Sequence, residues 1–174
     1  MKSSLIKKCN KIKLVMTDVD GVLTDGGMYY SQNGDVMKKF HSRDGMGVTL
    51  LREIDIPTII VTKEQTMIVK KWAKKMKIRK LLDGINNKEF VLKKICKEFK
   101  IKPENVAYIG DDVNDLKLMK TVGLSAAPAN AIKDAKKIST YTCIANGGEG
   151  AFREFVDLIL QNKKYNNKNH FLKR

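Results

Sequence analysis

The sequence predicts an α/β fold with a Rossmann-like, doubly wound parallel sheet, and three observations support this. Short apolar runs typical of buried strands alternate with longer segments that have helical periodicity. Most of these runs end in polar or Gly-containing turns. No repeat or linker divides the chain. Because strands that alternate with helices pair in parallel through right-handed crossovers, we expect one sheet with helices on its faces.

The boundaries of the predicted elements follow from these patterns. The apolar runs predict strands over residues 12–17, 58–62, 81–82, 106–109, 122–126 and 139–143. Apolar residues at helical spacing predict helices over residues 44–54, 65–76, 87–99, 129–136 and 150–160, and a further helix that ends at Lys120. We therefore expect a single domain over residues 1–162, followed by a basic tail over residues 163–174.

One segment does not fit the alternation of strands and helices. Residues 28–30 and 36–40 flank Asn33-Gly34, a pair that favours a tight hairpin turn. We therefore expect a β-hairpin inserted after the first strand, over about residues 26–41.

The composition argues against several classes of protein. No apolar stretch approaches the roughly 20 residues that cross a membrane. No apolar signal region follows the basic N-terminus, so we expect a cytoplasmic protein without a membrane partner. The three cysteines suggest neither a disulfide framework nor a zinc site. The net charge of +15 comes from lysines spread over nearly every segment, without a nucleic-acid-binding motif, so we expect an anionic substrate rather than a specific nucleic-acid partner.

Polar side chains gather where the predicted strands end. Asp18 and Asp20 follow the first strand, Thr62 ends the second, and Lys88 begins the helix before the strand 106–109. Three carboxylates come after that strand, and they are Asp111, Asp112 and Asp115. Because the carboxyl ends of parallel strands share one edge of a sheet, we expect these groups to converge. Carboxylates beside a hydroxyl and a lysine suit phosphoryl transfer assisted by Mg²⁺, which prefers oxygen ligands.

These residues resemble the four motifs of the haloacid dehalogenase-like (HAD) phosphohydrolases. The first motif, DxDGxxT, matches residues 18–24, and the second, a Thr or Ser at a strand end, matches Thr62. The third, a lysine, matches Lys88, and the fourth, GDDxxD, matches residues 110–115. The motifs occur in the order that the family has them. The resemblance implies the HAD fold and magnesium-dependent hydrolysis of a phosphomonoester.

The resemblance also implies a role for each matching residue. Asp18 would attack phosphorus and form an aspartyl phosphate, and Asp20 would protonate the leaving alcohol and then activate water. Asp18 and Asp111 would ligate Mg²⁺ through their side chains, and Asp20 through its backbone carbonyl. Thr62 and Lys88 would hold the phosphoryl oxygens. Two more carboxylates would support the waters of the metal or Lys88 rather than ligate the metal, and they are Asp112 and Asp115.

The chain has no segment long enough for the cap domain with which most HAD enzymes choose their substrates. From about residue 12 to residue 160 it instead resembles the capless branch that includes the 3-deoxy-D-manno-octulosonate 8-phosphate (KDO 8-phosphate) phosphatases. The resemblance rests on DVDGVLTDG, the hairpin, KKFHSRDGMG and GGEGAFRE. In that branch four subunits join through their hairpins, and a neighbouring subunit covers each active site. The resemblance therefore implies a homotetramer that acts on a sugar acid phosphate.

One departure from this branch bears on the substrate. The octulosonate enzymes usually carry Gly-Arg after the second-motif Thr, whereas this chain has Lys63-Glu64. A Glu at this position, and also Lys75, resemble relatives that act on nine-carbon sugar acids, the 9-phosphates of KDN or N-acetylneuraminate. Arg43 and Arg153 are candidates to pair with the substrate carboxylate, Arg153 from a neighbouring subunit, although Arg153 also fits a surface ion pair. We therefore favour a nine-carbon substrate, with KDO 8-phosphate as the alternative.

A receiver-type signalling domain is the alternative from another class. Such a domain also forms an aspartyl phosphate, with carboxylates, a Thr and a Lys around Mg²⁺. Its acidic pair is adjacent, however, and its phosphorylated Asp has no second Asp two residues later. Because Asp20 stands two residues after Asp18 and supplies a general acid, the sequence favours an enzyme.

Overall fold

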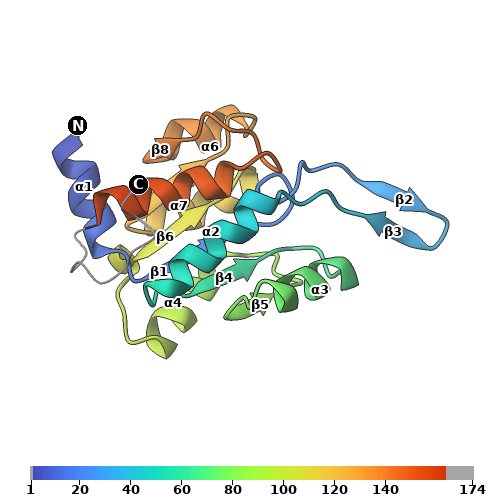
Figure 1. Cartoon of the computed structure of the whole chain (residues 1–174), viewed down its shortest axis with the longest axis horizontal. Helices are drawn as coiled ribbons and strands as arrows, with labels where there is room; N and C mark the ends of the chain where they lie inside the picture. The colour runs from blue at the N-terminus through green and yellow to red at the C-terminus, as the bar shows by residue number, and fades with distance from the viewer. Residues whose placement is uncertain (1, 164–174) are drawn as a thin grey trace.

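A parallel sheet forms the centre of the molecule (Figure 1). The computed structural model describes residues 2–163, and within this range the main sheet has six strands in the order β5-β4-β1-β6-β7-β8. The strands are β1 (Leu14–Thr17), β4 (Thr58–Val61), β5 (Lys80–Leu82), β6 (Val106–Ile109), β7 (Leu124–Ala127) and β8 (Tyr141–Thr142). The chain adds strands on one side of β1 as far as β5 and then continues with β6 on the other side. Ligands of open α/β sheets bind at such a reversal, outside the carboxyl ends of the strands.

Helices cover both faces of this sheet. The face that presents Val15 and Ile60 packs against α1 (Lys2–Lys11), α2 (Ser42–Glu53), α3 (Met67–Lys75) and α7 (Ala151–Asn162). The face that presents Met16 and Tyr108 packs against α4 (Glu89–Glu98), α5 (Leu116–Thr121) and α6 (Lys133–Ile138). Because both faces are buried, the central strands are apolar along almost their whole length. The predicted doubly wound α/β fold is confirmed.

The predicted strands and helices are present, and most of their ends lie within a few residues of the prediction. The largest difference concerns the helix predicted over residues 129–136, because α6 begins only at Lys133. Before it, the chain forms a turn in which the Asn130 side chain accepts a hydrogen bond from the Gly147 backbone N–H at 2.9 Å. This turn therefore contacts the loop that contains Gly147 instead of extending the helix towards its N-terminus.

The sequence did not predict α1, because lysines hide its narrow apolar stripe. Leu5 and Cys9 lie four residues apart and pack into the core on the side of α7. Lys163, the first residue of the predicted basic tail, donates from Nζ to the backbone oxygen of Ile12 at 2.5 Å and to that of Asn10 at 3.2 Å. It thus satisfies carbonyls at the end of α1. Residues 164–174 lie outside the described residues, so the tail stays a prediction.

The hairpin extends away from the sheet (Figure 1) and is formed by β2 (Tyr29–Ser31) and β3 (Gly34–Met37). Ser31 pairs with Gly34, so Gln32-Asn33 forms the turn, and the prediction that Asn33-Gly34 does so was wrong by one residue. Gly34, with φ +100°, instead starts the return strand. Within residues 2–163 the hairpin is the only insertion into the layered fold, as expected for a chain without a cap domain.

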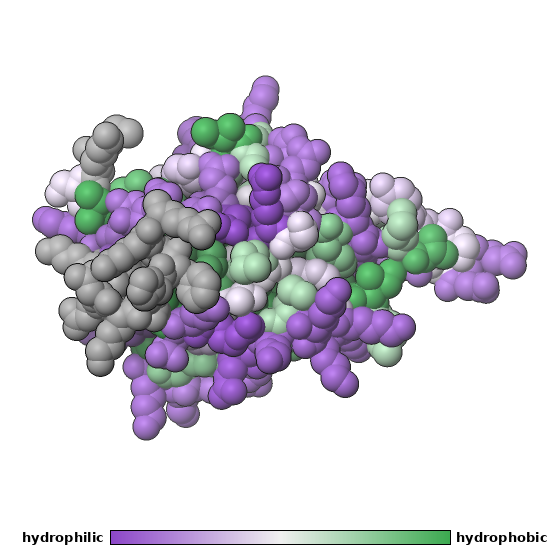
Figure 2. Space-filling view, viewed as in Figure 1, coloured by the Kyte–Doolittle hydropathy of each residue, from purple (hydrophilic) through white to green (hydrophobic). Residues whose placement is uncertain are grey.

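The stem of the hairpin is anchored, whereas the part between the stem and the hydrophilic tip exposes apolar side chains (Figure 2). Thr24 and Phe40 form an antiparallel bridge at the stem, and the Phe40 ring stacks on Trp72 of α3 with a centroid distance of 4.7 Å. Beyond the stem, large apolar residues are 39% to 60% exposed, and they are Met28, Tyr29, Tyr30, Val36 and Met37. An exposed apolar ribbon of this kind is typical of an interaction surface.

Within the described range, no helix is both long enough and apolar enough to cross a membrane. This agrees with the absence of a predicted span, and the cytoplasmic location stays a prediction.

A buried carboxylate connects α2 to the start of α7. Gly150 precedes α7 and has no side chain that could cap it. Asp44 of α2 takes this place, because its Oδ1 accepts the backbone N–H of Arg153 at 2.8 Å. Asp44 is fully buried, and its Oδ2 has no hydrogen-bond partner among the described residues. Burial raises the pKa of Asp44 to about 6, although the N–H and the charge of Arg153 oppose this.

This raised pKa makes the stability of the fold depend on pH. Since folded Asp44 binds its proton more tightly than the unfolded chain does, its contribution to stability is lost as the pH rises from about 4 to about 6. Asp44→Asn keeps an acceptor for the Arg153 N–H and removes the charge. We expect this variant to gain about 1–3 kcal/mol in the free energy of unfolding at about pH 7.5, and nothing near pH 4. Urea titrations at both pH values measure the gain, and an equal gain at both would exclude the charge as its cause.

Candidate active site

The carboxyl ends of β1, β4 and β6 meet at a pocket of about 250 Å³. The predicted site residues that line this pocket are Asp18, Asp20, Thr62, Glu64, Asp111 and Asp112. The loops that carry them follow β1, β4 and β6, where the winding of the sheet reverses. The predicted convergence at the sheet edge is therefore present in the structure.

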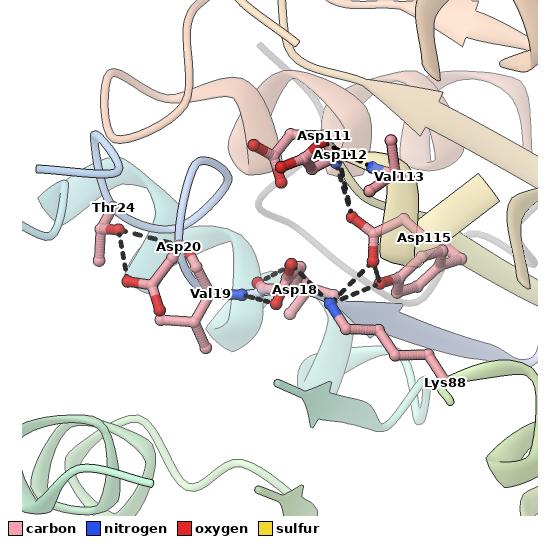
Figure 3. A network of polar contacts seen from close by, with 11 residues as sticks. Asp18, Val19, Asp20, Thr24, Lys88, Asp111, Asp112, Val113 and Asp115 are labelled. Carbon is pink, nitrogen blue, oxygen red and sulfur yellow. Dashed lines mark hydrogen bonds and ion pairs between the residues drawn. The ribbon is translucent and has the colours of Figure 1, made fainter. Parts of the chain in front are cut away.

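Lys88 lies directly before α4 and is buried between two carboxylates (Figure 3). Its Nζ is 2.6 Å from Asp18 Oδ2 and 2.8 Å from Asp115 Oδ1. Burial alone would lower the pKa of Lys88, but the two carboxylates outweigh it and raise this pKa above its usual value. The side chain is therefore an ammonium group that is fixed next to Asp18.

Asp115 supports this arrangement with both of its carboxylate oxygens (Figure 3). Oδ1 accepts the Tyr108 hydroxyl at 2.5 Å in addition to Lys88, and Oδ2 accepts the backbone N–H groups of Asp111 at 2.9 Å and Asp112 at 3.3 Å. Because both oxygens are occupied, Asp115 fits the predicted support of Lys88 rather than metal ligation. The sequence analysis did not select Tyr108. This residue lies within the apolar run of β6, and nothing in that run indicates that its hydroxyl contacts Asp115.

Asp18 and Asp111 form the part of the site that suits a cation. Ligand oxygens of Asp18, Asp111 and Asp115 lie within 4.8 Å of one another. Burial, with further contributions from Asp18, Asp115 and Asp112, raises the pKa of Asp111 to about 8. Burial also raises the pKa of Asp18, against the lowering by Lys88. A hard divalent cation that binds oxygen ligands would relieve the repulsion between the Asp18 and Asp111 carboxylates. These carboxylates therefore fit Mg²⁺.

Gly21, between the two motif carboxylates and Thr24, brings the β1 loop close to Asp111. Its φ of +78° belongs to the left-handed region, and a Cβ atom at this position would overlap Asp111 Oδ2. A side chain here would therefore push Asp111 away from Asp18, which explains the need for glycine after Asp20.

Asp20 is held from one side only. Its Oδ1 accepts hydrogen bonds from Lys38 Nζ at 2.7 Å and from the Thr24 hydroxyl at 3.3 Å, whereas Oδ2 has no partner among the described residues. The sequence analysis assigned no role to Lys38, although this lysine is the first residue of the KKFHSRDGMG segment that carries the branch resemblance. It lies one residue after the end of β3, at the hairpin stem.

The remaining residues of the pocket have simpler surroundings. Thr62 is 1% exposed at the end of β4, with Glu64 beside it in the pocket wall. Asp112 accepts the backbone N–H of Val113 at 2.7 Å and so caps the short 3₁₀ helix η2 (Val113–Asp115). These positions agree with the predicted ones, and their predicted roles are taken up below.

Three predicted substrate contacts lie apart from the pocket in the described part of the chain. Lys75 lines a different pocket, next to Trp72 and Phe40. Arg43 and Arg153 line a cavity of about 600 Å³ beside α7, and Arg153 Nε pairs with Asp157 Oδ1 at 2.8 Å. Arg153 therefore forms a surface ion pair, which is the simpler of the two interpretations given above. Contact of any of the three with substrate stays a prediction.

The loop before α7, which contains GGEG, packs backbone to backbone against the catalytic loop. The Gly148 N–H donates to the Val22 backbone oxygen at 3.0 Å, and a Cβ atom at Gly147 would overlap the Gly21 backbone oxygen. Asn130 fixes the same loop through the Gly147 N–H. The glycines of this motif thus allow the loop to reach the pocket wall.

The family of this chain follows from its similarity to known proteins. The model of the haloacid dehalogenase-like hydrolases matches residues 60–154. The chain belongs to this family of enzymes, and the receiver-type alternative is rejected. Within the family it belongs to the branch of the KDO 8-phosphate phosphatases, as the following relatives show.

The 3-deoxy-D-manno-octulosonate 8-phosphate phosphatase KdsC of Haemophilus influenzae is 38% identical over 155 residues, which cover 89% of this chain and 86% of the relative. The enzyme of Escherichia coli K12 is 38% identical over 158 residues, with 91% and 84% covered. The crystal structure of the Moraxella catarrhalis enzyme, which holds a magnesium ion, a phosphate ion and KDO, has a TM-score of 0.90, 32% identity and 94% coverage of both chains. The cobalt-bound Haemophilus influenzae enzyme has a TM-score of 0.87 at 38% identity, with 90% and 91% covered.

The buried position of Lys88 leads to a prediction for stability. Lys88→Met leaves Asp18 and Asp115 facing each other without a cation, which we expect to lower the free energy of unfolding of the metal-free protein by about 3–5 kcal/mol near pH 7.5. The loss of unfolding free energy should be smaller near pH 5, since protonation of the carboxylates that faced Lys88 removes their uncompensated negative charge. Urea denaturation at both pH values measures it.

Lys117→Met provides a matched control for this variant. Lys117 is also a lysine in an ion pair, with Glu89 at 3.2 Å, but its side chain is 76% exposed. Its loss should cost at most about 1 kcal/mol. Equal losses for the two variants would contradict the structural importance of the buried amine.

Proposed function

We propose that this protein is a magnesium-dependent phosphatase that hydrolyses KDO 8-phosphate. The observation that carries this proposal is the placement of Asp18 and Asp111 in one pocket at the reversal point of the sheet, with the buried Lys88 amine against Asp18. The names of the relatives support the substrate, since the chain covers at least 84% of the two enzymes described above.

Asp18 would be the nucleophile. One of its oxygens would form a bond to phosphorus while the bond from phosphorus to the sugar oxygen breaks, leaving an aspartyl phosphate. Lys88 holds the Asp18 carboxylate at 2.6 Å, and the Val19 N–H donates to its other oxygen at 2.7 Å, so its orientation is fixed before the substrate arrives. Such preorganisation is a large part of phosphoryl-transfer catalysis.

Asp18 and Asp111 would hold Mg²⁺ with their side chains, and Asp20 with its backbone carbonyl. When bound, the ion would compensate the negative charge of the phosphoryl oxygens and of the two carboxylates. Thr62 and Lys88 would donate to the same phosphoryl oxygens. Asp112 would hold waters around the ion, and Asp115 would hold Lys88.

Asp20 would serve as acid and then as base. It would give a proton to the leaving sugar oxygen, and it would later take a proton from the water that attacks the aspartyl phosphate and releases phosphate. Its Oδ2 carries no hydrogen bond within the described residues and could make this exchange.

The proposed substrate differs from the one that the sequence analysis favoured. We favoured a nine-carbon sugar acid because of Glu64 and Lys75, but the relatives reported above support the octulosonate alternative instead. One observation keeps the nine-carbon acids as second candidate: Glu64 lines the pocket, where a carboxylate can accept hydrogen bonds from sugar hydroxyls. Lys63 lines the same pocket and offers a positive charge to a substrate carboxylate.

A steady-state comparison tests the function and the substrate together. We expect kcat/KM for KDO 8-phosphate with magnesium to exceed that for KDN and N-acetylneuraminate 9-phosphates by about tenfold or more, a difference of about 1.4 kcal/mol in transition-state binding. Asp18→Asn or removal of magnesium by chelation should lower turnover by at least about a thousandfold. Equally slow hydrolysis of all three would contradict the sugar acid assignment, and no hydrolysis of any phosphomonoester would contradict the phosphatase.

We also propose that the protein forms a homotetramer through its hairpins, with a neighbouring subunit supplying Arg153 to the site. The exposed apolar residues of β2 and β3 support this, because a two-stranded ribbon with an apolar surface gains stability by packing against other copies.

Charges introduced into this ribbon test the assembly. Tyr30→Asp together with Val36→Asp should convert the tetramer to smaller species, because the charges would be buried in an apolar interface. Light scattering coupled to gel filtration measures the mass. Lys94→Asp on α4, also an exposed position, is the control that should leave the mass unchanged. A monomeric wild-type protein at micromolar concentration would contradict the tetramer.

A further inference from the structure

The site contains a second buried lysine, and it comes from the hairpin stem rather than from the sheet. The side chain of Lys38 is 1% exposed. Its Nζ lies 2.7 Å from Asp20 Oδ1 and 3.5 Å from Asp35 Oδ2 of β3. Burial alone would lower the pKa of Lys38, but Asp20 and Asp35 outweigh it, so the pKa is raised and the group is an ammonium. A buried charge is costly unless it is paired, so this lysine is held in place by its two carboxylates.

The contact fixes which oxygen of Asp20 is left without a hydrogen-bond partner. Lys38 and Thr24 both donate to Oδ1, so the carboxylate cannot rotate without breaking two hydrogen bonds. Oδ2 is left without a partner among the described residues, although it is buried. An unsatisfied buried oxygen in a residue that lines a pocket is typical of a functional group.

We propose that Lys38 is a positioning residue for the reaction, which keeps Asp20 turned so that Oδ2 exchanges the proton with the leaving group. Through Asp35 it also joins the hairpin to the catalytic loop, beside the bridge between Thr24 and Phe40. This inference rests on the proposed phosphatase function. A merely structural ion pair would affect the rates with all substrates alike, whereas the proposed role affects only the step in which Asp20 exchanges a proton.

The dependence on the leaving group separates these two roles. Protonation matters for a sugar alkoxide and matters little for 4-nitrophenolate, which leaves without a proton. Lys38→Met should lower the single-turnover rate of leaving-group release from the sugar acid phosphate by about 30–100-fold, with KM within about threefold of the wild type. The rate with 4-nitrophenyl phosphate should fall by less than about fivefold.

Lys39→Met is the matched control. Lys39 is the next residue of the stem, its side chain is 53% exposed, and its Nζ lies 3.9 Å from Asp25 rather than from Asp20. Lys39→Met changes the net charge by the same amount as Lys38→Met. We expect Lys39→Met to leave the rates with both substrates within about twofold of the wild type. Equal losses for the two substrates with Lys38→Met, or an equal loss with Lys39→Met, would overturn the inference.

A double-mutant cycle tests whether Lys38 acts through Asp20. Lys38→Met added to Asp20→Asn should cost less than about twofold beyond Asp20→Asn alone, because the group that Lys38 positions is already gone. Losses that multiply would overturn the inference. If Lys38→Met does not fold, Lys38→Ala with added propylamine replaces it: recovery of the sugar acid phosphate rate by several fold supports the inference, and no recovery overturns it.

The outcomes for the two proposals are distinguishable. A wild-type protein that hydrolyses no phosphomonoester would overturn the proposed function, and the role of Lys38 with it. An active wild type with an equally active Lys38→Met variant would overturn the role of Lys38 alone.

Discussion

The buried ion pair between Lys88 and Asp18 is the interaction on which the rest of the site depends. Taking a lysine and several carboxylates out of water is unfavourable unless the charges face each other and every donor and acceptor is used. Asp115 and Tyr108 complete this requirement, since together they fix the amine and the loop that follows β6. The carboxyl edge of the sheet can therefore hold charge in a largely apolar surrounding.

The surplus of carboxylates at this edge gives the site its chemical character. Asp111 adds a further carboxyl group, and burial together with the neighbouring carboxylates raises its pKa to about 8. Such a site favours a divalent cation and, once the cation is present, an anionic phosphoryl group between the cation and Lys88. The two buried lysines thus have separate positions: Lys88 faces Asp18, the proposed nucleophile, and Lys38 faces Asp20, the proposed acid.

The sequence predicted what depends on local pattern. Strand ends, the hairpin and the residues Asp18, Asp20, Thr62, Lys88 and Asp111 could be located, because chain order in a parallel sheet determines where strand ends meet. Contacts that depend on packing between distant segments could not be located. Lys38 and Asp44 owe their roles to burial beside Asp20 and Arg153, and the sequence contains no signal of burial for a charged residue.

Likewise, α1 was missed because only two of its residues, Leu5 and Cys9, form the apolar stripe between many lysines, and propensity says little about a short helix that tertiary contacts stabilise. The substrate contacts stay predictions. Lys75, Arg43 and Arg153 do not line the pocket that holds Asp18, and no pattern in the sequence shows how they would reach a substrate there.

The contact of Gly147 and Gly148 with the catalytic loop has a consequence for biosynthesis. The loop over residues 18–25 leaves the ribosome early, but the backbone that packs against it comes from a segment near the end of the described chain. Domains complete their cores only when all of their segments have been synthesised. A nascent chain that has formed β1, β4 and β6 would therefore hold its acidic residues at the sheet edge without a finished pocket wall. Catalytic competence therefore requires that residues 147–148 have been synthesised and have packed against the loop over residues 18–25.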